Sequence, residues 1–241
     1  MVDDNGILWL DTCASTNDEA MNRADDLAVR AVVAHQQNAG RGRRGRTWHS
    51  PEGTGLYLSW IARPTFSAGL GGVLPLMGAV AVAEVCEGLG LRCTVKWPND
   101  LLVGGAKLAG VLCEARGTPA RWSAVVGIGL NLRTPPGGWP REVPAVALDA
   151  HLDVLPAPAG LACKVLDRLD HWLGRVTFEA NPRAVLQAWE LWAPARGSWM
   201  RRGELEGRFA GLAPDGALRL DVSGSVVLVH AGDVELLDRE D

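Results

Sequence analysis

The chain has 241 residues, with 24 Lys and Arg against 28 Asp and Glu, and so carries a formal net charge of −4. Hydrophobic residues make up 47% and charged residues 22%, proportions that exclude a disordered chain and predict an ordinary globular protein. The slightly acidic balance argues against a protein that coats nucleic acid, because such domains are usually strongly basic. The length suits one sizeable domain, or a domain of roughly 190 residues followed by a small appendage.

The cysteines and the start of the chain favour a reducing cytoplasm. The five cysteines are an odd number without C-x-x-C spacing, and no signal-peptide pattern opens the chain. The long uncharged stretch over residues 64–83 holds two prolines and four glycines, so it does not predict a membrane span. Apolar residues at helical spacing from Val73 onward predict a buried helix there instead.

The first half of the chain alternates helical and extended patterns. Residues 15–23 open with Ser-Thr-Asn, which favour a helix N-terminus, and predict a helix. Strands are expected over 31–34 and 56–60, separated by a loop rich in glycine and arginine. Beyond the helix from residue 73, further strands are expected at 93–97, 101–103, 108–114 and 122–132. Because short turns join these neighbours, we expect a mixed and largely antiparallel sheet.

The second half predicts two helices and a small β module. Residues 134–158 are rich in Pro and Gly and predict a surface loop, which leads to helices over 159–177 and 182–192. Short strands separated by Asp-Gly and Ser-Gly turns then predict a barrel-like module of roughly 45 residues. These strands are expected at 207–211, 217–221 and 226–229. We therefore expect a first domain over residues 1–194 and a second over 195–241.

The segment Gly40-Arg-Gly-Arg-Arg-Gly-Arg46 is the strongest local signal for chemistry. Its glycines let the backbone approach a ligand closely, and its arginines supply planar, permanently charged donors that fit phosphate and carboxylate. The segment is not a phosphate-binding P-loop, because no Gly-Lys-Ser/Thr follows at the required spacing. Taken alone, it is equally consistent with a loop that closes over an anion, with an RNA contact and with a solvated loop without function.

Five motifs, in order and at matching spacings, connect this segment to a known family. They are Ser15-Thr16-Asn17, residues 37–48, Lys96-Trp97-Pro98-Asn99-Asp100, Lys107 to Gly110 and Gly127 to Asn131. In these motifs the sequence resembles the biotin protein ligases, strongly over residues 9–132 and more loosely beyond. The resemblance implies an α+β fold, in which a mixed β-sheet backed by helices, like that of class II aminoacyl-tRNA synthetases, is followed by a small SH3-like β-barrel.

The resemblance also implies a two-step reaction. The family joins biotin to ATP, forming biotinyl-5′-AMP and pyrophosphate, and then transfers biotin to one lysine of a biotin carboxyl carrier domain. The first step brings several negative charges together, so positioning and charge stabilisation should supply most of the catalysis. Mg²⁺ is expected to arrive with ATP, since the histidines and cysteines lack the spacing of a protein-built zinc site.

Positions that match the family's motifs identify candidate catalytic residues. Lys107 matches the lysine that bridges the biotin carboxylate and the α-phosphate, and Arg43 belongs to the loop that orders over the adenylate. Asp100 matches the position where the acceptor lysine meets the adenylate. Lys96 is a further candidate phosphate contact, and Glu114 is a candidate carboxylate that supports the site or a Mg²⁺ ion.

The same matching identifies residues that are expected to bind biotin or the adenylate. Short hydroxyl and amide side chains suit the two N–H groups and the carbonyl of biotin's ureido ring, and arginines suit the phosphate. The expected set is Ser15, Thr16, Asn17, Gln37, Gly40, Arg41, Gly42, Arg43, Arg46, Trp48, Lys107, Gly110, Gly127, Gly129 and Asn131.

Each assignment has a purely structural alternative. Ser-Thr-Asn is an ordinary N-cap sequence, a role that is compatible with ligand binding. Lys107 also suits the surface of a hairpin, and Asp100 suits a turn after Pro-Asn. Gly127 and Gly129 also suit a β-bulge. We expect Arg44, which lies between two site residues, to face solvent.

Rival functions and partners also follow from the sequence. A lipoate or octanoate ligase of the same fold, an RNA-binding module and a regulatory biotin binder without turnover are alternatives. Fewer than fifteen residues precede Ser15, so we expect a ligase without an N-terminal DNA-binding domain and no specific DNA binding. We expect a carboxyl carrier domain as partner, no membrane association and a cytoplasmic location, with monomer and homodimer both left open.

Overall fold

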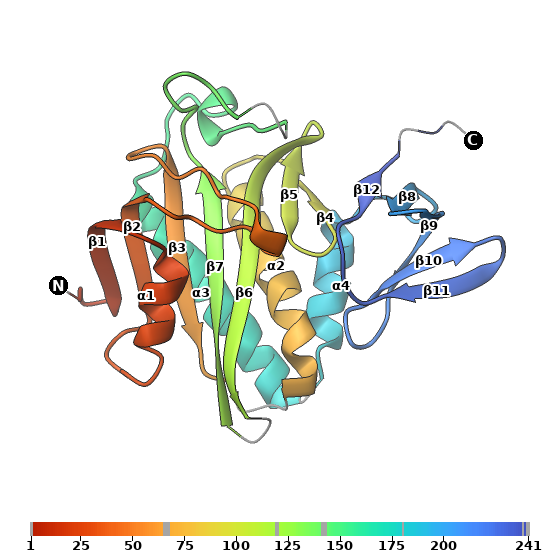
Figure 1. Cartoon of the computed structure of the whole chain (residues 1–241), viewed down its shortest axis with the longest axis horizontal. Helices are drawn as coiled ribbons and strands as arrows, with labels where there is room; N and C mark the ends of the chain where they lie inside the picture. The colour runs from red at the N-terminus through yellow and green to blue at the C-terminus, as the bar shows by residue number, and fades with distance from the viewer. Residues whose placement is uncertain are drawn as a thin grey trace.

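A seven-stranded sheet forms the centre of the molecule, and a five-stranded sheet lies at its C-terminal end (Figure 1). The computed structural model describes residues 2–64, 68–118, 121–140, 144–179, 181–237 and 239. The strands of the central sheet lie in the order β1-β2-β3-β7-β6-β5-β4. Their bounds are β1 Ile7–Cys13, β2 Ala31–Gln37, β3 Gly55–Ala62, β4 Thr94–Lys96, β5 Asp100–Val103, β6 Ala106–Thr118 and β7 Arg121–Asn131.

The pairing of these strands is mixed. Within the described ranges, β1 and β2 run parallel, while each of the other neighbouring pairs runs antiparallel. This arrangement confirms the prediction of a mixed and largely antiparallel sheet. Short connections join β4 to β5, β5 to β6 and β6 to β7, whereas residues 38–54 join β2 to β3, and β3 pairs with β7 only after the chain has passed through α2 and β4 to β6.

Helices cover the two faces of the central sheet unequally. The long helices α2 (Leu74–Glu87), α3 (Pro158–Glu179) and α4 (Arg183–Trp192) pack on one face, and the short α1 (Thr16–Asn22) lies on the other (Figure 1). Alternate residues of β3 serve both layers: Trp60 joins the large core under the long helices, and Ile61 joins a small core under α1. The α1 face is therefore only partly covered by helix, which leaves room there for a cavity.

Glycine allows α2 to approach the sheet closely. A Cβ added to Gly78 would lie 2.8 Å from the Val111 side chain of β6 and 3.0 Å from the Val126 side chain of β7. The helix is buried on nearly all sides, as its run of small apolar residues predicts. It thus holds β6 and β7, whose other face carries the site described below.

The C-terminal sheet has the strand order β11-β10-β9-β8-β12. Its strands are β8 Trp199–Arg202, β9 Leu205–Leu212, β10 Leu218–Val222, β11 Ser225–Val229 and β12 Glu235–Leu236. Neighbours pair antiparallel in an open row, with no pairing of β11 to β12 among the described residues. Contacts that tie this sheet and its loops to the rest of the molecule include the Trp97 Nε1 hydrogen bond to the Gly216 carbonyl (3.0 Å), the Arg46–Asp233 ion pair (2.8 Å) and the hydrogen bond from the Leu212 N–H to Glu190 of α4 (3.1 Å).

Several elements differ from the sequence prediction. Strands β1, β8 and β12 are not among the predicted ones; the Ile-Leu-Trp-Leu run of β1 does not alternate in polarity, and short apolar runs do not reveal their period. The predicted surface loop over 134–158 contains a short 3₁₀ turn at Leu148–Ala150. Residues 65–67 of the long uncharged stretch and 141–143 of that loop lie outside the described residues. No helix in the described part of the chain is long and apolar enough to cross a membrane.

Candidate active site

A cavity of about 560 Å³ opens on the α1 face of the central sheet. Strands β6 and β7 form its floor, and the start of α1 and residues 40–48, here called the arginine loop, form its sides. Every candidate catalytic or binding residue except Gly40 lines it, whereas the further candidates Lys96 and Glu114 are not among the lining residues. Gly40 lies at the base of the arginine loop, where its carbonyl accepts the Trp48 N–H (2.9 Å) and where an added Cβ would lie 2.5 Å from the Trp48 carbonyl.

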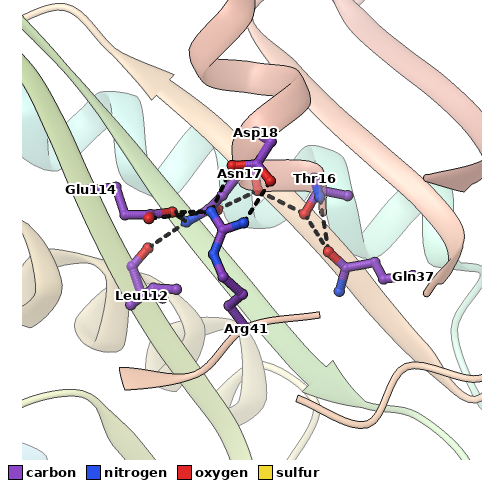
Figure 2. Close-up of polar contacts among 8 residues, drawn as sticks. Thr16, Asn17, Asp18, Gln37, Arg41, Leu112 and Glu114 are labelled. Carbon is purple, nitrogen blue, oxygen red and sulfur yellow. Dashed lines mark hydrogen bonds and ion pairs between the residues drawn. The ribbon is translucent and has the colours of Figure 1, made fainter. Parts of the chain in front are cut away.

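Short polar side chains gather at the α1 end of the cavity. The Gln37 carbonyl oxygen accepts the backbone N–H of Thr16 (2.8 Å) and contacts its hydroxyl (3.1 Å) (Figure 2). The Gln37 amide donates to Ser50 (2.9 Å). Ser15 occupies the N-cap position of α1 but makes no side-chain capping bond. Ser15, Thr16 and Asn17 are all buried, so their polar atoms form a preorganised end wall.

Arg41 is held by two carboxylates. Its guanidinium donates to both oxygens of Asp18 (2.5 and 2.7 Å) and to Glu114 (2.9 Å), and Figure 2 shows it between the two. The hydrogen bond from Arg41 is the main cause that lowers the pKa of Asp18 below its usual value, so Asp18 stays ionised at neutral pH. In this structure the charge of Arg41 is therefore matched within the protein, and Arg41 anchors the start of the arginine loop.

The other arginines of the loop point to different partners. Arg43 donates to the Asn99 side-chain carbonyl (3.1 Å), and the Asn99 amide donates in turn to the Val111 carbonyl (2.6 Å). Arg46 pairs with Asp233 of the C-terminal sheet, and Arg44 is exposed, as expected, with its side chain 68% accessible. Arg43 therefore lines the cavity while bound to Asn99, and Arg46 links the arginine loop to the second sheet.

Three charged side chains meet at the opposite end of the cavity. The Lys107 ammonium lies 2.7 Å from one oxygen of Asp100, and the Lys96 ammonium lies 3.5 Å from the other. The side chain of Asp100 is only 13% exposed. The backbone of Lys107 is hydrogen-bonded to residues 144–146, because its N–H donates to the Pro144 carbonyl and its carbonyl accepts the Val146 N–H. The sheet thus holds a lysine–aspartate–lysine cluster at the edge of the cavity.

Trp48 lies over two glycines that face each other on β6 and β7. Gly110 and Gly129 are cross-strand partners, and a Cβ added to Gly129 would lie 2.3 Å from the Trp48 ring. The Lys107 ammonium lies 5.3 Å from the centre of the same ring. The Trp48 Nε1 is buried and has no hydrogen-bond partner within the described residues. The flat Trp48 ring therefore packs directly against the two glycines, and any side chain at Gly129 would occupy the space of the ring.

Two regions of the chain match known protein families. A sequence model described as "Biotin/lipoate A/B protein ligase family" matches residues 10–131, and one described as "Biotin protein ligase C terminal domain" matches residues 200–237. The chain belongs to the biotin/lipoate A/B protein ligase family. Its C-terminal match places it among the biotin protein ligases, which confirms the resemblance found in the five motifs.

Relatives in this family cover nearly the whole chain. The bifunctional ligase/repressor BirA of Bacillus subtilis is 32% identical over 95% of this chain and 74% of its own length. The biotin–[acetyl-CoA-carboxylase] ligase of Paracoccus denitrificans is 31% identical over 91% of this chain and 96% of its own length. The structure of the Aquifex aeolicus biotin protein ligase in complex with biotin and ATP matches with a TM-score of 0.75 at 27% identity, covering 96% of this chain and 98% of that one. The likeness confirms the predicted fold.

Some residues of this biotin protein ligase cavity are absent from the sequence-based set. Asn99 lies inside the Lys96–Asp100 motif, but nothing in the sequence indicated that it would contact Arg43. Trp139, from the Pro/Gly-rich segment, lines the cavity without any sequence signal for it. Asn131 lines the cavity as expected, but its amide donates to the carbonyls of Lys107 and Val146, so it also fixes the cavity wall. In the described part of the chain, no three His, Cys, Asp or Glu side chains are grouped to hold a metal.

Proposed function

We propose that this cavity binds biotin and Mg²⁺-bound ATP, joins them as biotinyl-5′-AMP and then transfers biotin to a lysine of a carboxyl carrier domain. The observation that carries the proposal is the layout of one continuous cavity. Buried hydroxyl and amide groups line one end of it, and Lys107, Arg43 and Asp100 line the other. Such a cavity matches a substrate with a polar ring at one end and a reacting carboxylate at the other.

The α1 end is the proposed ureido subsite. The two N–H groups of the ureido ring require acceptors, which the oxygens of Thr16, Asn17 and Gln37 supply. Leu112 and Ile128 line the adjoining floor and suit the apolar part of biotin. A dithiolane ring has no N–H group, so lipoate would form no hydrogen bond with these oxygens. This chemistry favours biotin over lipoate.

The first step is an attack of the biotin carboxylate on the α-phosphorus of ATP, with pyrophosphate as leaving group. Lys107 balances the charge of the carboxylate and the α-phosphate as they approach, and it exchanges its ion pair with Asp100 for the substrate. Arg43 supplies a second cation from the arginine loop. Trp48 packs against the adenylate. The Mg²⁺ ion belongs to the ATP substrate and neutralises part of the triphosphate charge.

Replacing Arg43 by alanine is expected to release biotinyl-5′-AMP roughly 10- to 100-fold faster, because a charged hydrogen bond to the intermediate is lost. Rapid-quench and filter-binding measurements of adenylate retention test this. Arg92→Ala removes the same charge at an exposed position outside the cavity and should leave retention unchanged. Retention of wild-type strength in the Arg43 variant would remove Arg43 from the binding site.

The second step is an attack of the acceptor lysine's amine on the acyl carbon of the adenylate, which breaks the bond to phosphate and releases AMP. The amine must first lose a proton, and Asp100 is the carboxylate that borders the cavity at this end. Asp100 either accepts this proton or orients the ammonium that loses it to solvent. Lys107 and Lys96 flank Asp100 and form ion pairs with its carboxylate at the cavity edge.

The Asp100→Asn variant keeps the shape of the side chain and removes its charge. It is expected to slow biotin transfer by roughly 100-fold, a typical loss for a proton-transfer group, while adenylate formation changes by less than about tenfold. Single-turnover measurements of the two steps with a purified carrier domain separate these effects. Asp153→Asn, at an exposed position outside the cavity, is the matched control. Equal slowing of both steps would assign Asp100 to holding Lys107 rather than to the acceptor amine.

The substrate assignment is tested by pyrophosphate release. The purified protein is incubated with Mg²⁺-ATP and either biotin, lipoate or octanoate, and release is expected with biotin alone. Release with lipoate but not biotin would overturn the proposal. Omitting Mg²⁺ should abolish release. The proposed location is the cytoplasm, where five free cysteines stay reduced, and the proposed carrier is a domain of a biotin-dependent carboxylase.

A further inference from the structure

We propose that Glu114 and Ser59, which lie outside the cavity, set the hydrogen-bond polarity of the ureido subsite and so determine its selectivity for a ligand with two N–H donors. The inference rests on the proposed function, since it concerns the same subsite. Neither residue is among those that line the cavity. Both act through Thr16 and Asn17, and so they are positioning residues.

Glu114 determines which way the Asn17 amide faces. The Asn17 nitrogen lies 2.7 Å from a Glu114 carboxylate oxygen and 3.3 Å from the Leu112 carbonyl oxygen (Figure 2). Both partners only accept hydrogen bonds, so the opposite orientation would bring the Asn17 oxygen against two other oxygens. Asn17 is 5% exposed, so water offers little compensation. The amide is therefore locked with its oxygen on the side away from Glu114.

Ser59 carries this polarity to Thr16. Its hydroxyl oxygen lies 2.6 Å from the Asn17 oxygen and 2.8 Å from the Thr16 hydroxyl oxygen, and the residue is fully buried. Because the Asn17 oxygen is not a donor, the single hydroxyl proton of Ser59 must point to it. Ser59 then accepts from Thr16. The order of donors in this chain is thus imposed from the Glu114 end.

The hydroxyl proton of Thr16 and the amide protons of Gln37 have acceptors within the protein. The Thr16 hydroxyl proton has two protein acceptors, Ser59 and the Gln37 oxygen, so it does not face a ligand. The Gln37 oxygen is itself fixed as an acceptor, because its amide nitrogen donates to Ser50. The oxygens of Thr16, Asn17 and Gln37 therefore offer only lone pairs to the cavity. A ligand must bring N–H donors to satisfy them, as a cyclic urea does.

The position of Glu114 is itself held by charge. Arg41 donates to Glu114 (2.9 Å) and to both oxygens of Asp18. The Glu114 carboxylate therefore binds both the first arginine of the arginine loop and the Asn17 amide of the subsite. Asn17 also lies against Gly127, where an added Cβ would come within 2.1 Å of the amide oxygen. The amide is thus confined on three sides by Glu114, Ser59 and the β7 backbone.

The test compares ligands that differ only in their donors. Isothermal titration calorimetry measures the binding of biotin and of a biotin methylated at a ureido nitrogen, without ATP or turnover, to the wild-type chain, Glu114→Gln and Ser59→Ala. A glutamine side chain at position 114 can offer either a donor or an acceptor to Asn17, so the Asn17 amide is no longer restricted to one orientation. We expect both variants to bind biotin roughly 10- to 100-fold more weakly, and to lose at least tenfold of the preference for biotin over the methylated compound.

A matched control separates this effect from a general loss of charge. Glu19→Gln changes another ion-paired carboxylate, which lies on α1 and pairs with Arg23 at the C-cap of that helix, and it should leave both affinities unchanged. Ser59→Ala variants are checked for folding by circular dichroism, and Glu114→Gln, which keeps the size of the side chain, preserves the test if the buried variant unfolds. A Glu114→Gln variant that binds biotin as tightly as the wild type overturns the inference. Equal weakening of both ligands overturns it too, because a purely structural role does not distinguish between them. The wild-type chain itself tests the proposed function: if it binds no biotin, that function fails together with the inference.

Discussion

Replacing Lys107 by alanine is expected to slow the formation of biotinyl-5′-AMP by about 100- to 1000-fold, the usual loss when one preorganised charge-stabilising group is removed. The ammonium of Lys107 lies at the end of the cavity where the carboxylate and the α-phosphate must meet, and its peptide is fixed on both sides by residues 144–146. A neutral methyl group in its place leaves the repulsion between the two anions uncompensated. Single-turnover quench experiments with labelled ATP measure this rate directly.

Lys164 provides a matched control for Lys107. The chain has three lysines, and Lys164 is the one on the exposed surface of α3, far in sequence and structure from the cavity. Lys164→Ala should form the adenylate at the wild-type rate. The Lys107 variant should still bind biotin within a few fold of the wild type, since the ureido subsite lies at the other end of the cavity. An unchanged single-turnover rate in Lys107→Ala would exclude Lys107 from the chemistry.

Replacing Gly127 by alanine is expected to weaken biotin binding by more than about 100-fold. The new Cβ would lie 2.1 Å from the Asn17 amide oxygen, a distance that real side chains do not adopt. Asn17 does not move aside freely, because Glu114 and Ser59 hold its amide at both ends. The added methyl group therefore displaces the acceptor on which the ureido subsite depends. Calorimetric titration with biotin measures the loss.

The control for this variant is a glycine with free space around it. A Cβ added to Gly174, in the middle of α3, meets no atom within 4 Å. Gly174→Ala should bind biotin normally and should be more stable by about 0.5–1 kcal/mol, since alanine has the higher helix propensity. Thermal unfolding of the Gly127 variant must also show a cooperative transition. Wild-type biotin affinity in a folded Gly127→Ala protein would contradict the assignment of this end of the cavity.

The elements that pack against one another locally were largely predictable from the sequence. The helical spacing from Val73 predicted α2 to within one residue of its observed start, and the strands predicted at 108–114 and 122–132 fall on β6 and β7. In contrast, β1 escaped prediction because it is an edge strand in which only Ile7 and Cys13, at its two ends, are buried. The period of a hydrophobic pattern reflects which residues of a segment are buried and which are exposed. In an edge strand this contrast is small, so the pattern is weak.

The candidate site divides in the same way. Sequence motifs nominated the residues at both ends of the cavity, and all of the candidate catalytic and binding residues except Gly40 line it, whereas Lys96 and Glu114 do not. Motifs did not indicate that Arg41 is matched by Asp18 and Glu114, or that Arg46 reaches Asp233. Ser59 gave no signal at all, since a serine in a strand is unremarkable until its neighbours in space are known.

The sequence by itself determined the family, the order of the motifs and the kinds of groups available for the reaction, because these are properties of residue type and local spacing. The tertiary structure alone decided which charges are free to meet a substrate and which are used within the protein. Arg41 lies 73 residues from Glu114, and Arg46 lies 187 residues from Asp233. Contacts over such separations depend on strand order and register, which bring distant segments together and which no local pattern encodes. The acidic average charge gave no sign of this group of arginines, and only the fold shows that Arg41, Arg43 and Arg46 have different partners.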